Sequence, residues 1–544
     1  MRVLLILCTF SLFFPVRQVH AGKTKTDQPA LVVGIVVDQM RADYLYRYEG
    51  VFGNNGFKRL MREGHVCENT FIRYLPTYTG PGHAGIYTGS VPALHGIASN
   101  DWFERNPWRS VYCTTDTSVQ AVGGNARAGK MSPTNLWATT ITDELRLSSN
   151  FRSKVFAVSV KDRASILPGG HTANAAYWMD DSNGVFMSST YYMNQLPKWV
   201  NAFNAKNSAK TYMDGNWNLM LPTNRYTQSA PDEQAYEGKF LNETNTSFPH
   251  KLSHLRGADI KKTPFGNNIL ADFAKQLVQE EQLGQGAATD FLCISFSSTD
   301  YVGHMYGPNA LELEDTYARL DAVMADLLEY LDREVGQGRY TVFLTSDHGV
   351  AHNPQYLKNN KLPGDFFFGR DLRKNLNQQL ATRFPVVPDS LIKEVGENYI
   401  WLNDALMQAR NISRNEVVDA VMENLKMYPE IQWAVDMKKL GQTALPEPIA
   451  SMAVHGYVAQ RSCDILLLLK PGYLDAYSKT GSTHGTWNPF DARIPLLFYG
   501  WGIQPGITYA SVAMHDIAAT ISSLLHIPLP NACIGQPIVP VIQK

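Results

Sequence analysis

The sequence has few cysteines, no long apolar stretch beyond its first residues and no excess of charge of either sign. Its 544 residues include 6 cysteines. None stands in a C-x-x-C pair, which excludes a disulfide-rich scaffold and a zinc ribbon. No later run reaches the roughly 18 apolar residues of a membrane-spanning helix, so we expect no stable membrane insertion. The 49 basic and 50 acidic residues nearly balance, which argues against a nucleic-acid partner.

The N-terminus has the pattern of a secretory signal. Arg2 precedes an apolar run over residues 3–14, and Val19-His20-Ala21 offers a cleavage site. Residues 1–21 are therefore predicted to be removed on export, most simply to a periplasm. Five cysteines would remain in the mature chain, and an oxidising compartment would allow one or two disulfides.

Short runs of Val, Ile, Leu and Phe predict strands that are buried on both faces, as in a mostly parallel sheet. These runs cover residues 31–37, 155–160, 291–296, 341–344 and 494–499. Helical periodicity lies between them, most clearly over residues 310–335. The alternation predicts an α/β fold with three layers, a central sheet flanked by helices.

Two long stretches differ in character from this core. Residues 170–265 are rich in Tyr, Trp, Asn, Ser and Thr, and residues 355–480 mix a helical pattern over 416–428 with a Pro-rich turn. We interpret both as insertions that cap the sheet. Residues 22–544 would then form a single catalytic domain with two insertions.

Charged and polar side chains follow four of the predicted strands directly. They are Asp38, the segment Lys161-Asp162-Arg163, the segment from Asp300 to His304, and the pair Asp347-His348. In open α/β sheets the carboxyl ends of the strands form the ligand crevice. The four segments are therefore expected to meet at one edge of the sheet.

Three carboxylates and three imidazoles in the chain suit a pair of zinc ions. They are Asp38, Asp300, His304, Asp347, His348 and His484, the last in a small-residue loop. A single Asp after a strand is more often a helix N-cap. Six such groups together would repel one another without a cation between them, so we favour a two-metal site.

A nucleophile is offered by Thr79. Gly80 and Pro81 suit the cap and first turn of a helix, so Thr79 would stand just before a helix N-terminus, where free amides favour an anion. A nearby metal would lower the pKa of its hydroxyl. The hydroxyls of Thr77, Thr88 and Ser90 are interpreted as ordinary loop or helix-end groups, and the imidazoles of His83 and His95 as structural.

Three further side chains could bind a phosphoryl group. The Asn100 amide could donate a hydrogen bond, and Lys161 and Arg163 could supply positive charge. Lys161 and Arg163 would point the same way if their strand continued. The alternatives are a turn-forming Asn and surface charges paired with Asp162.

These residues resemble the active site of the phosphate-irrepressible (PafA-type) alkaline phosphatases, relatives of the nucleotide pyrophosphatase/phosphodiesterases. The similarity extends over nearly the whole mature chain. It includes the strings VVDQMR at 36–41, GSVP at 89–92, KDRASILP at 161–168 and STDYVGH at 298–304.

The resemblance implies a role for each of these residues. Asp300, His304 and His484 would hold one zinc ion, and Asp38, Asp347 and His348 the other, with Thr79 as an additional ligand. Thr79 would attack phosphorus to give a phosphothreonine, which water then hydrolyses. Asn100, Lys161 and Arg163 would neutralise the phosphoryl oxygens in the transition state.

The expected function is therefore an exported alkaline phosphatase that acts on small phosphate monoesters as a monomer. A phosphodiesterase or nucleotide pyrophosphatase on the same scaffold is the nearest alternative. A sulfatase would need Cys or Ser in place of Thr79 and a following Arg, and a mutase would normally use Ser. A zinc-dependent surface binding protein without turnover is the alternative from another class.

Overall fold

The structure is a computed structural model that describes residues 28–384, 390–396, 398–475 and 478–542. The predicted signal segment 1–21 lies outside these residues. No helix among the described residues is both long and apolar enough to cross a membrane. The cysteines that the structure describes are all free thiols, so no disulfide joins any two of them.

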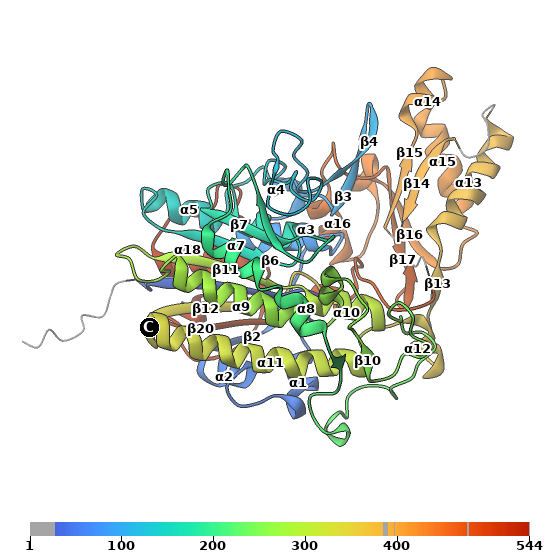
Figure 1. Ribbon diagram of the computed structural model, residues 1–544. Coiled ribbons are helices and arrows are strands. Elements are labelled where there is room, and N and C mark those ends of the chain that lie inside the picture. The colour runs from blue at the N-terminus through green and yellow to red at the C-terminus, as the bar shows by residue number, and fades with distance from the viewer. Residues whose placement is uncertain (1–27, 385–389, 397, 476–477, 543–544) are drawn as a thin grey trace, which may run out of the picture.

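A central sheet of eleven strands organises the described chain (Figure 1). In spatial order its strands are β19 (Arg493–Ile494), β2 (His65–Phe71), β20 (Leu496–Gly500), β12 (Tyr340–Thr345), β1 (Leu31–Val37), β11 (Asp290–Phe296), β6 (Val155–Ser159), β7 (Ala175–Met179), β8 (Phe186–Ser189) and β5 (Ala121–Val122), while β21 (Gly506–Ala513) pairs with β2.

Strands β12, β1, β11, β6 and β7 are parallel, whereas β20 and β8 run antiparallel to their neighbours. The predicted run 494–499 is split between β19 and β20 at Pro495, which has no N–H for a ladder bond. The predicted mostly parallel sheet is thus confirmed at its centre, and the pairs at its flanks are antiparallel except for β2 with β21.

Helices cover both faces of the sheet and give three layers. Alternate residues of β1 point to opposite cores, Val33 and Ile35 to one and Val32 and Val36 to the other. The first core contains side chains of α2 (Phe57–Glu63), α9 (Phe265–Glu280), α10 (Ser298–Tyr306) and α11 (Leu311–Leu331). The second contains side chains of α3 (Thr79–Thr88), α5 (Ile141–Ser148), α6 (Arg163–Gly169) and α18 (Asp516–Leu525).

The region 355–480 builds a separate small sheet with its own apolar core, which stands at the upper right of Figure 1 in orange. Its strands are β14 (Ile392–Gly396), β15 (Tyr399–Leu402), β17 (Ile465–Leu469) and β16 (Ile431–Asp436). Helices α13 (Gly369–Arg383), α14 (Asp404–Ala409), α15 (Arg414–Leu425) and α16 (Ile449–Gly456) belong to the same region. We name residues 355–480 the second insertion.

The region 170–265 differs from the predicted capping insertion in one respect. Its strands β7 and β8 extend the central sheet, since β7 pairs in parallel with β6. Both strands are fully buried and belong to the central sheet, so this part of the predicted capping insertion lies in the core. The rest of the region forms α7 (Lys198–Ala205), α8 (Ser208–Met213) and the short pair β9 (Asn216–Trp217) and β10 (His250–Lys251).

A β-hairpin connects the core to the second insertion. It consists of β3 (Asp101–Arg105) and β4 (Trp108–Tyr112). Phe103 stacks on Trp108, and both rings meet Trp401 of β15 edge to face. Arg105 donates hydrogen bonds to Asp404 and Asp464 of the insertion. Figure 1 shows the hairpin between the core and the orange sheet.

Candidate active site

Four neighbouring strands deliver the predicted site residues to one edge of the sheet. Strands β12, β1, β11 and β6 are adjacent and parallel, so their carboxyl ends coincide. Asp38 follows β1 directly, and Asp347-His348 follow β12. Asp300 and His304 lie on α10, which begins two residues after β11. The structure thus gathers these predicted residues, although they are spread over 310 positions of the chain.

The first group of possible metal ligands consists of Asp38, Asp347 and His348. One ligand atom from each of the three lies within 4.8 Å of the others. The Nε2 atom of His348 is 3.5 Å from Asp38 Oδ1 and 3.4 Å from Asp347 Oδ2. All three side chains are buried.

The second group contains Asp300 and His484, and it shares His348 with the first. The rings of His348 and His484 stack with centroids 3.4 Å apart. His304, which we expected in this group, contacts it from outside: its Nε2 is 3.2 Å from Asp300 Oδ1, and its side chain is 38% exposed. The structure therefore brings five of the six predicted ligands into two adjoining groups, and His304 contacts Asp300 from outside them.

Each of the three histidines presents the same ring nitrogen to the site. The Nδ1 atoms of His304, His348 and His484 lie 2.8 to 2.9 Å from backbone carbonyl oxygens, of Ser482, Gly349 and Thr77 respectively. A carbonyl can only accept, so Nδ1 carries the hydrogen in each case. Nε2 keeps its lone pair and faces the carboxylates. This tautomer is the one that binds a metal through Nε2.

The buried carboxylates of the site would be stabilised by bound cations. Burial, with the charge of Asp347 adding to it, raises the pKa of Asp38 to about 7. Asp38 Oδ1 and Asp347 Oδ2 are buried and have no hydrogen-bond partner among the described residues. Unpaired buried carboxylate oxygens are costly unless a cation neutralises them. The donor set, carboxylates with Nε2-presenting histidines, fits zinc.

Thr79 is the first residue of α3, one position further into the helix than predicted. Its Oγ1 lies 3.3 Å from His348 Nε2 and 3.5 Å from an Arg163 guanidinium nitrogen. The hydroxyl is thus buried between the possible metal ligands and a cation. Both neighbours would stabilise an alkoxide at this oxygen. Thr77 Oγ1 instead donates to the Thr486 carbonyl, and Thr88 Oγ1 to that of Ala84.

Asn100 and Arg163 are positioned by the β3–β4 hairpin. The Asn100 Oδ1 atom accepts a hydrogen bond of 2.7 Å from Gly80 N, which fixes the amide so that Nδ2 is its donor. At the same open end of the hairpin, where Asp101 pairs with Tyr112, the Tyr112 hydroxyl accepts from Arg163 at 3.0 Å and donates to Asp162. Strand β6 ends at Ser159, so Arg163 begins α6 and does not extend the strand.

Lys161 lies deeper in the site than Arg163. Its Nζ is 2.7 Å from Asp38 Oδ2 and 2.5 Å from Asp300 Oδ2, so it touches a carboxylate of each ligand group. Burial acts to lower the pKa of Lys161, but Asp300 and Asp38 raise it above its usual value. The ammonium is therefore a fixed positive charge beside both carboxylates.

Two residues that were not predicted as ligands support the carboxylates: Gln39, and His83, which was interpreted as structural. Gln39 donates its backbone N–H to Asp347 Oδ1 at 3.2 Å and its side-chain amide to Asp300 Oδ1 at 2.8 Å. His83 Nδ1 lies 3.3 Å from Asp347 Oδ2. At Gly82 a Cβ would stand 2.6 Å from the Asp347 Cβ, so glycine allows α3 to approach. In the sequence, the one signal for such support is the position of Gln39 directly after the predicted ligand Asp38.

Comparisons with known proteins agree with this geometry. Residues 32–489 match the model of the type I phosphodiesterase/nucleotide pyrophosphatase family. The chain is 45% identical over 531 residues to alkaline phosphatase PafA of Elizabethkingia meningoseptica, covering 96% of this chain and 97% of the relative. It is also 45% identical over 527 residues to a protein of Myroides odoratus named calcium-transporting ATPase, with 96% of each chain covered.

A solved structure extends the similarity to three dimensions. The crystal structure of wild-type alkaline phosphatase PafA superposes with a TM-score of 0.92 at 44% identity. It covers 95% of this chain and 99% of that chain. The fold and the order of its elements are therefore shared over nearly the full length.

Proposed function

The chain belongs to the type I phosphodiesterase/nucleotide pyrophosphatase family and within it to the PafA-like alkaline phosphatases, and we propose that it is an exported two-zinc enzyme that hydrolyses phosphate monoesters through a phosphothreonine at Thr79. The observation that carries the proposal is the position of the Thr79 hydroxyl. It lies between His348, which both ligand groups share, and the Arg163 guanidinium.

Six side chains would hold the two zinc ions. Asp38, Asp347 and His348 form one group, and Asp300, His304 and His484 supply the other, with Thr79 as a further oxygen ligand. Bound there, two divalent cations would supply Lewis acidity toward the attacking and leaving oxygens of an in-line displacement.

The residues of the chain account for binding and proton control. Arg163, together with the Asn100 amide and Lys161, offers donors to the non-bridging oxygens, where charge must be neutralised in the transition state. The Thr79 hydroxyl gives up its proton and its oxygen forms the new bond to phosphorus as the bond to the ester oxygen breaks, and the departing alkoxide takes up a proton to leave as the alcohol. Water then cleaves the phosphothreonine and restores Thr79.

Two cations favour monoesters over diesters. A monoester dianion presents three charged non-bridging oxygens, whereas a diester uses one position for a second organic group. The name of the matching family keeps a phosphodiesterase as the second candidate. Arg163 beside Thr79, and Lys161 beside Asp38 in the same site, support the monoesterase over it.

The test compares p-nitrophenyl phosphate with bis-p-nitrophenyl phosphate as substrates of the zinc-loaded chain 22–544. We expect a large preference in kcat/KM for the monoester, which is lost in Thr79→Ala and with chelator. A preference for the diester would move the chain to the phosphodiesterases. Ligand binding without turnover of either ester would identify a binding protein instead.

Export is tested separately by expressing the full chain. We propose that residues 1–21 are cleaved and that the mature protein collects in the periplasm as a monomer. N-terminal sequencing of the periplasmic protein measures the cleavage, and light scattering measures the oligomeric state. Retention of residues 1–21 would contradict the signal assignment.

A further inference from the structure

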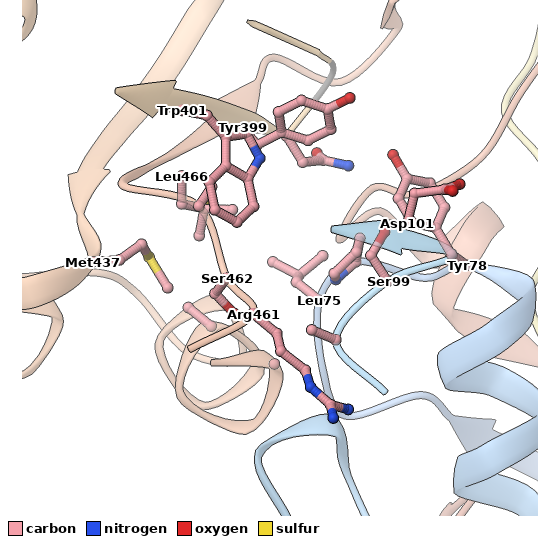
Figure 2. A pocket seen from close by; sticks show the side chains of 16 residues that line it. Leu75, Tyr78, Ser99, Asp101, Tyr399, Trp401, Met437, Arg461, Ser462 and Leu466 are labelled. Carbon is pink, nitrogen blue, oxygen red and sulfur yellow. The ribbon is translucent and has the colours of Figure 1, made fainter. Parts of the chain in front are cut away.

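A pocket with largely apolar walls lies between the core and the second insertion, close to Thr79 but outside the group of metal ligands (Figure 2). Its deep walls are buried apolar side chains from both parts of the chain: Leu75, Ala98, Trp401, Met437, Ala453 and Leu466. Figure 2 shows Trp401 and Tyr399 on one side, Tyr78, Ser99 and Asp101 opposite them, and Leu75 between.

The aromatic wall is held in place from behind. The Trp401 ring packs edge to face against Phe103 and Trp108, and the Arg105 guanidinium lies 4.9 Å from its centroid. Arg105 in turn is fixed by ion pairs with Asp404 and Asp464. The aromatic wall of the pocket is therefore held in place by contacts within the protein.

The rim of the pocket is continuous with the active site. Tyr78 precedes Thr79, Ser99 and Asp101 flank Asn100, and Asn398 donates a hydrogen bond of 2.9 Å to the carbonyl of Gly485, next to His484. The Tyr78 ring also meets the His484 ring edge to face at 5.6 Å. Residues next to Thr79, Asn100 and His484 therefore border the pocket.

The direction of the reaction points to the same side. In an in-line displacement the leaving group lies opposite the attacking Thr79 oxygen. A hollow on the His304 side of the site is lined by His304 and Ser482, and it shares Tyr78 and Tyr399 with the pocket. The organic group of an ester thus has a path past the two tyrosines to Trp401.

The cation nearest the pocket is turned away from it. Arg461 donates to the carbonyls of Gly96 and Asn135, and its guanidinium lies over the rings of Trp102 and Trp137. In Figure 2 the guanidinium points away from Trp401. The remaining charge at the rim is Asp101, which is exposed. A second phosphate would meet no cation here, whereas an uncharged ring would meet aromatic and aliphatic walls.

We propose that this pocket binds the leaving group of the substrate and selects monoesters whose alcohol carries an aromatic or similarly apolar ring. The proposal rests on the proposed monoesterase activity and adds a substrate class to it. Aromatic rings gain from burial against Trp401 and Tyr399, and Tyr78 offers an edge contact.

The first experiment uses the wild-type enzyme with two matched primary alcohol esters, 2-phenylethyl phosphate and ethyl phosphate. Their leaving groups have similar basicity, so a difference reports binding of the ring. We expect kcat/KM to be higher for 2-phenylethyl phosphate by about tenfold or more, the effect of burying a phenyl-sized group. Equal values would overturn the proposal. Turnover of neither ester would instead overturn the proposed monoesterase activity.

Two variants of opposite design assign the selectivity to the pocket. Tyr399→Leu removes the ring at the entrance of the pocket, and Ala453→Phe fills its deep end. Both variants are expected to reduce the preference for 2-phenylethyl phosphate over ethyl phosphate to about twofold. Both should hydrolyse ethyl phosphate nearly as fast as the wild type does. Tyr473→Leu, in β18 (Tyr473–Asp475) of the same insertion and away from the pocket, is the matched control and should keep the preference. Equal losses of kcat/KM on both esters in the pocket variants would show that the pocket residues only stabilise the fold and do not bind the leaving group. If either variant fails to fold, the other and the wild-type comparison decide.

Discussion

The two halves of the active site are built in different ways. The metal half, with Asp38, Asp347 and His348, follows adjacent parallel strands and is fully buried. The phosphate half, with Asn100 and Arg163, is half-buried and depends on the β3–β4 hairpin. The first half is fixed by the sheet itself, whereas the second is fixed by contacts that reach the second insertion.

This difference in construction means that the residues proposed to hold the metals and the residues proposed to bind the phosphate are held in place by different contacts. Backbone ladders on both sides hold β1, so its C-terminal carboxylate can hardly move. The hairpin is held by side chains, through Arg105 to the insertion and through Tyr112 to Arg163. Changes in the insertion can therefore alter how the phosphate and its organic group are bound while the metal half stays the same.

The largest effect is expected from breaking the metal half. Asp347→Ala removes a ligand of the first group and should lower kcat/KM by at least about a thousandfold for monoester and diester alike. Bound zinc, measured by mass spectrometry, should fall together with activity. Asp365→Ala, at an exposed ion pair with Lys358, is the control and should change neither quantity. Full zinc content with normal activity in Asp347→Ala would remove this residue from the site.

The next largest effect is expected in the phosphate half, and there it should depend on the substrate. Arg163→Ala and Lys161→Ala should each lower monoesterase kcat/KM by about a hundredfold, because a charge on the transition state loses its partner. Diesterase activity should fall much less, since a diester presents fewer charged oxygens. Equal losses on p-nitrophenyl phosphate and bis-p-nitrophenyl phosphate would contradict the assignment of these two cations.

A smaller effect of the same kind is expected from Tyr112→Phe. The variant keeps the ring but loses the hydroxyl that accepts from Arg163 and donates to Asp162. We expect monoesterase kcat/KM to fall roughly fivefold to tenfold, the cost of one hydrogen bond to a charged group. In an Arg163→Ala background the same change should have little further effect. Additive losses would show that Tyr112 acts independently of Arg163.

Most of the metal half could be predicted from the sequence because its signals are local. An unbroken apolar run fixed both ends of β1, and the polar residue that follows a buried strand is placed by the sheet. The support of the carboxylates was not predictable in this way. Gln39 and His83 reach Asp347 only after strands and helices distant in sequence have packed.

The residues proposed for the phosphate half can be named from the sequence, but their geometry cannot. The sequence identified Asn100, Lys161 and Arg163, yet the role of Tyr112 depends on hairpin pairing across its whole length. Strands β7 and β8 were missed because their Tyr, Trp and Ser residues resemble a surface segment by composition. Composition does not report which residues are buried, so neither the contacts of Tyr112 nor the place of β7 and β8 in the sheet could be predicted from it.

The smallest effect on activity is expected from changing His250, which lies in a buried ion cluster behind α10. This change should alter the stability of the fold and leave activity nearly unchanged. His250 lies between Glu243 and Glu312, with Nδ1 and Nε2 at 3.0 and 3.1 Å from carboxylate oxygens. Although burial acts to lower it, the two carboxylates raise the pKa of His250 to about 9. Burial raises the pKa of Glu312 to about 7.

Both shifts make the folded state bind protons more tightly than the unfolded state. The contribution of His250 is complete below its unfolded pKa near 6.5 and is lost as the pH rises through about 9. The contribution of Glu312 is complete below its unfolded pKa of 4.5 and is lost as the pH rises through about 7. The free energy of unfolding should therefore fall by on the order of 2 kcal/mol between pH 6 and pH 9. In His250→Gln the fall should be clearly shallower, while kcat/KM at pH 8 stays within about twofold because no contact of His250 reaches the phosphate half. Urea denaturation at pH 6, 7.5 and 9 measures the slopes, and parallel profiles for the two proteins would place the pH dependence elsewhere in the molecule.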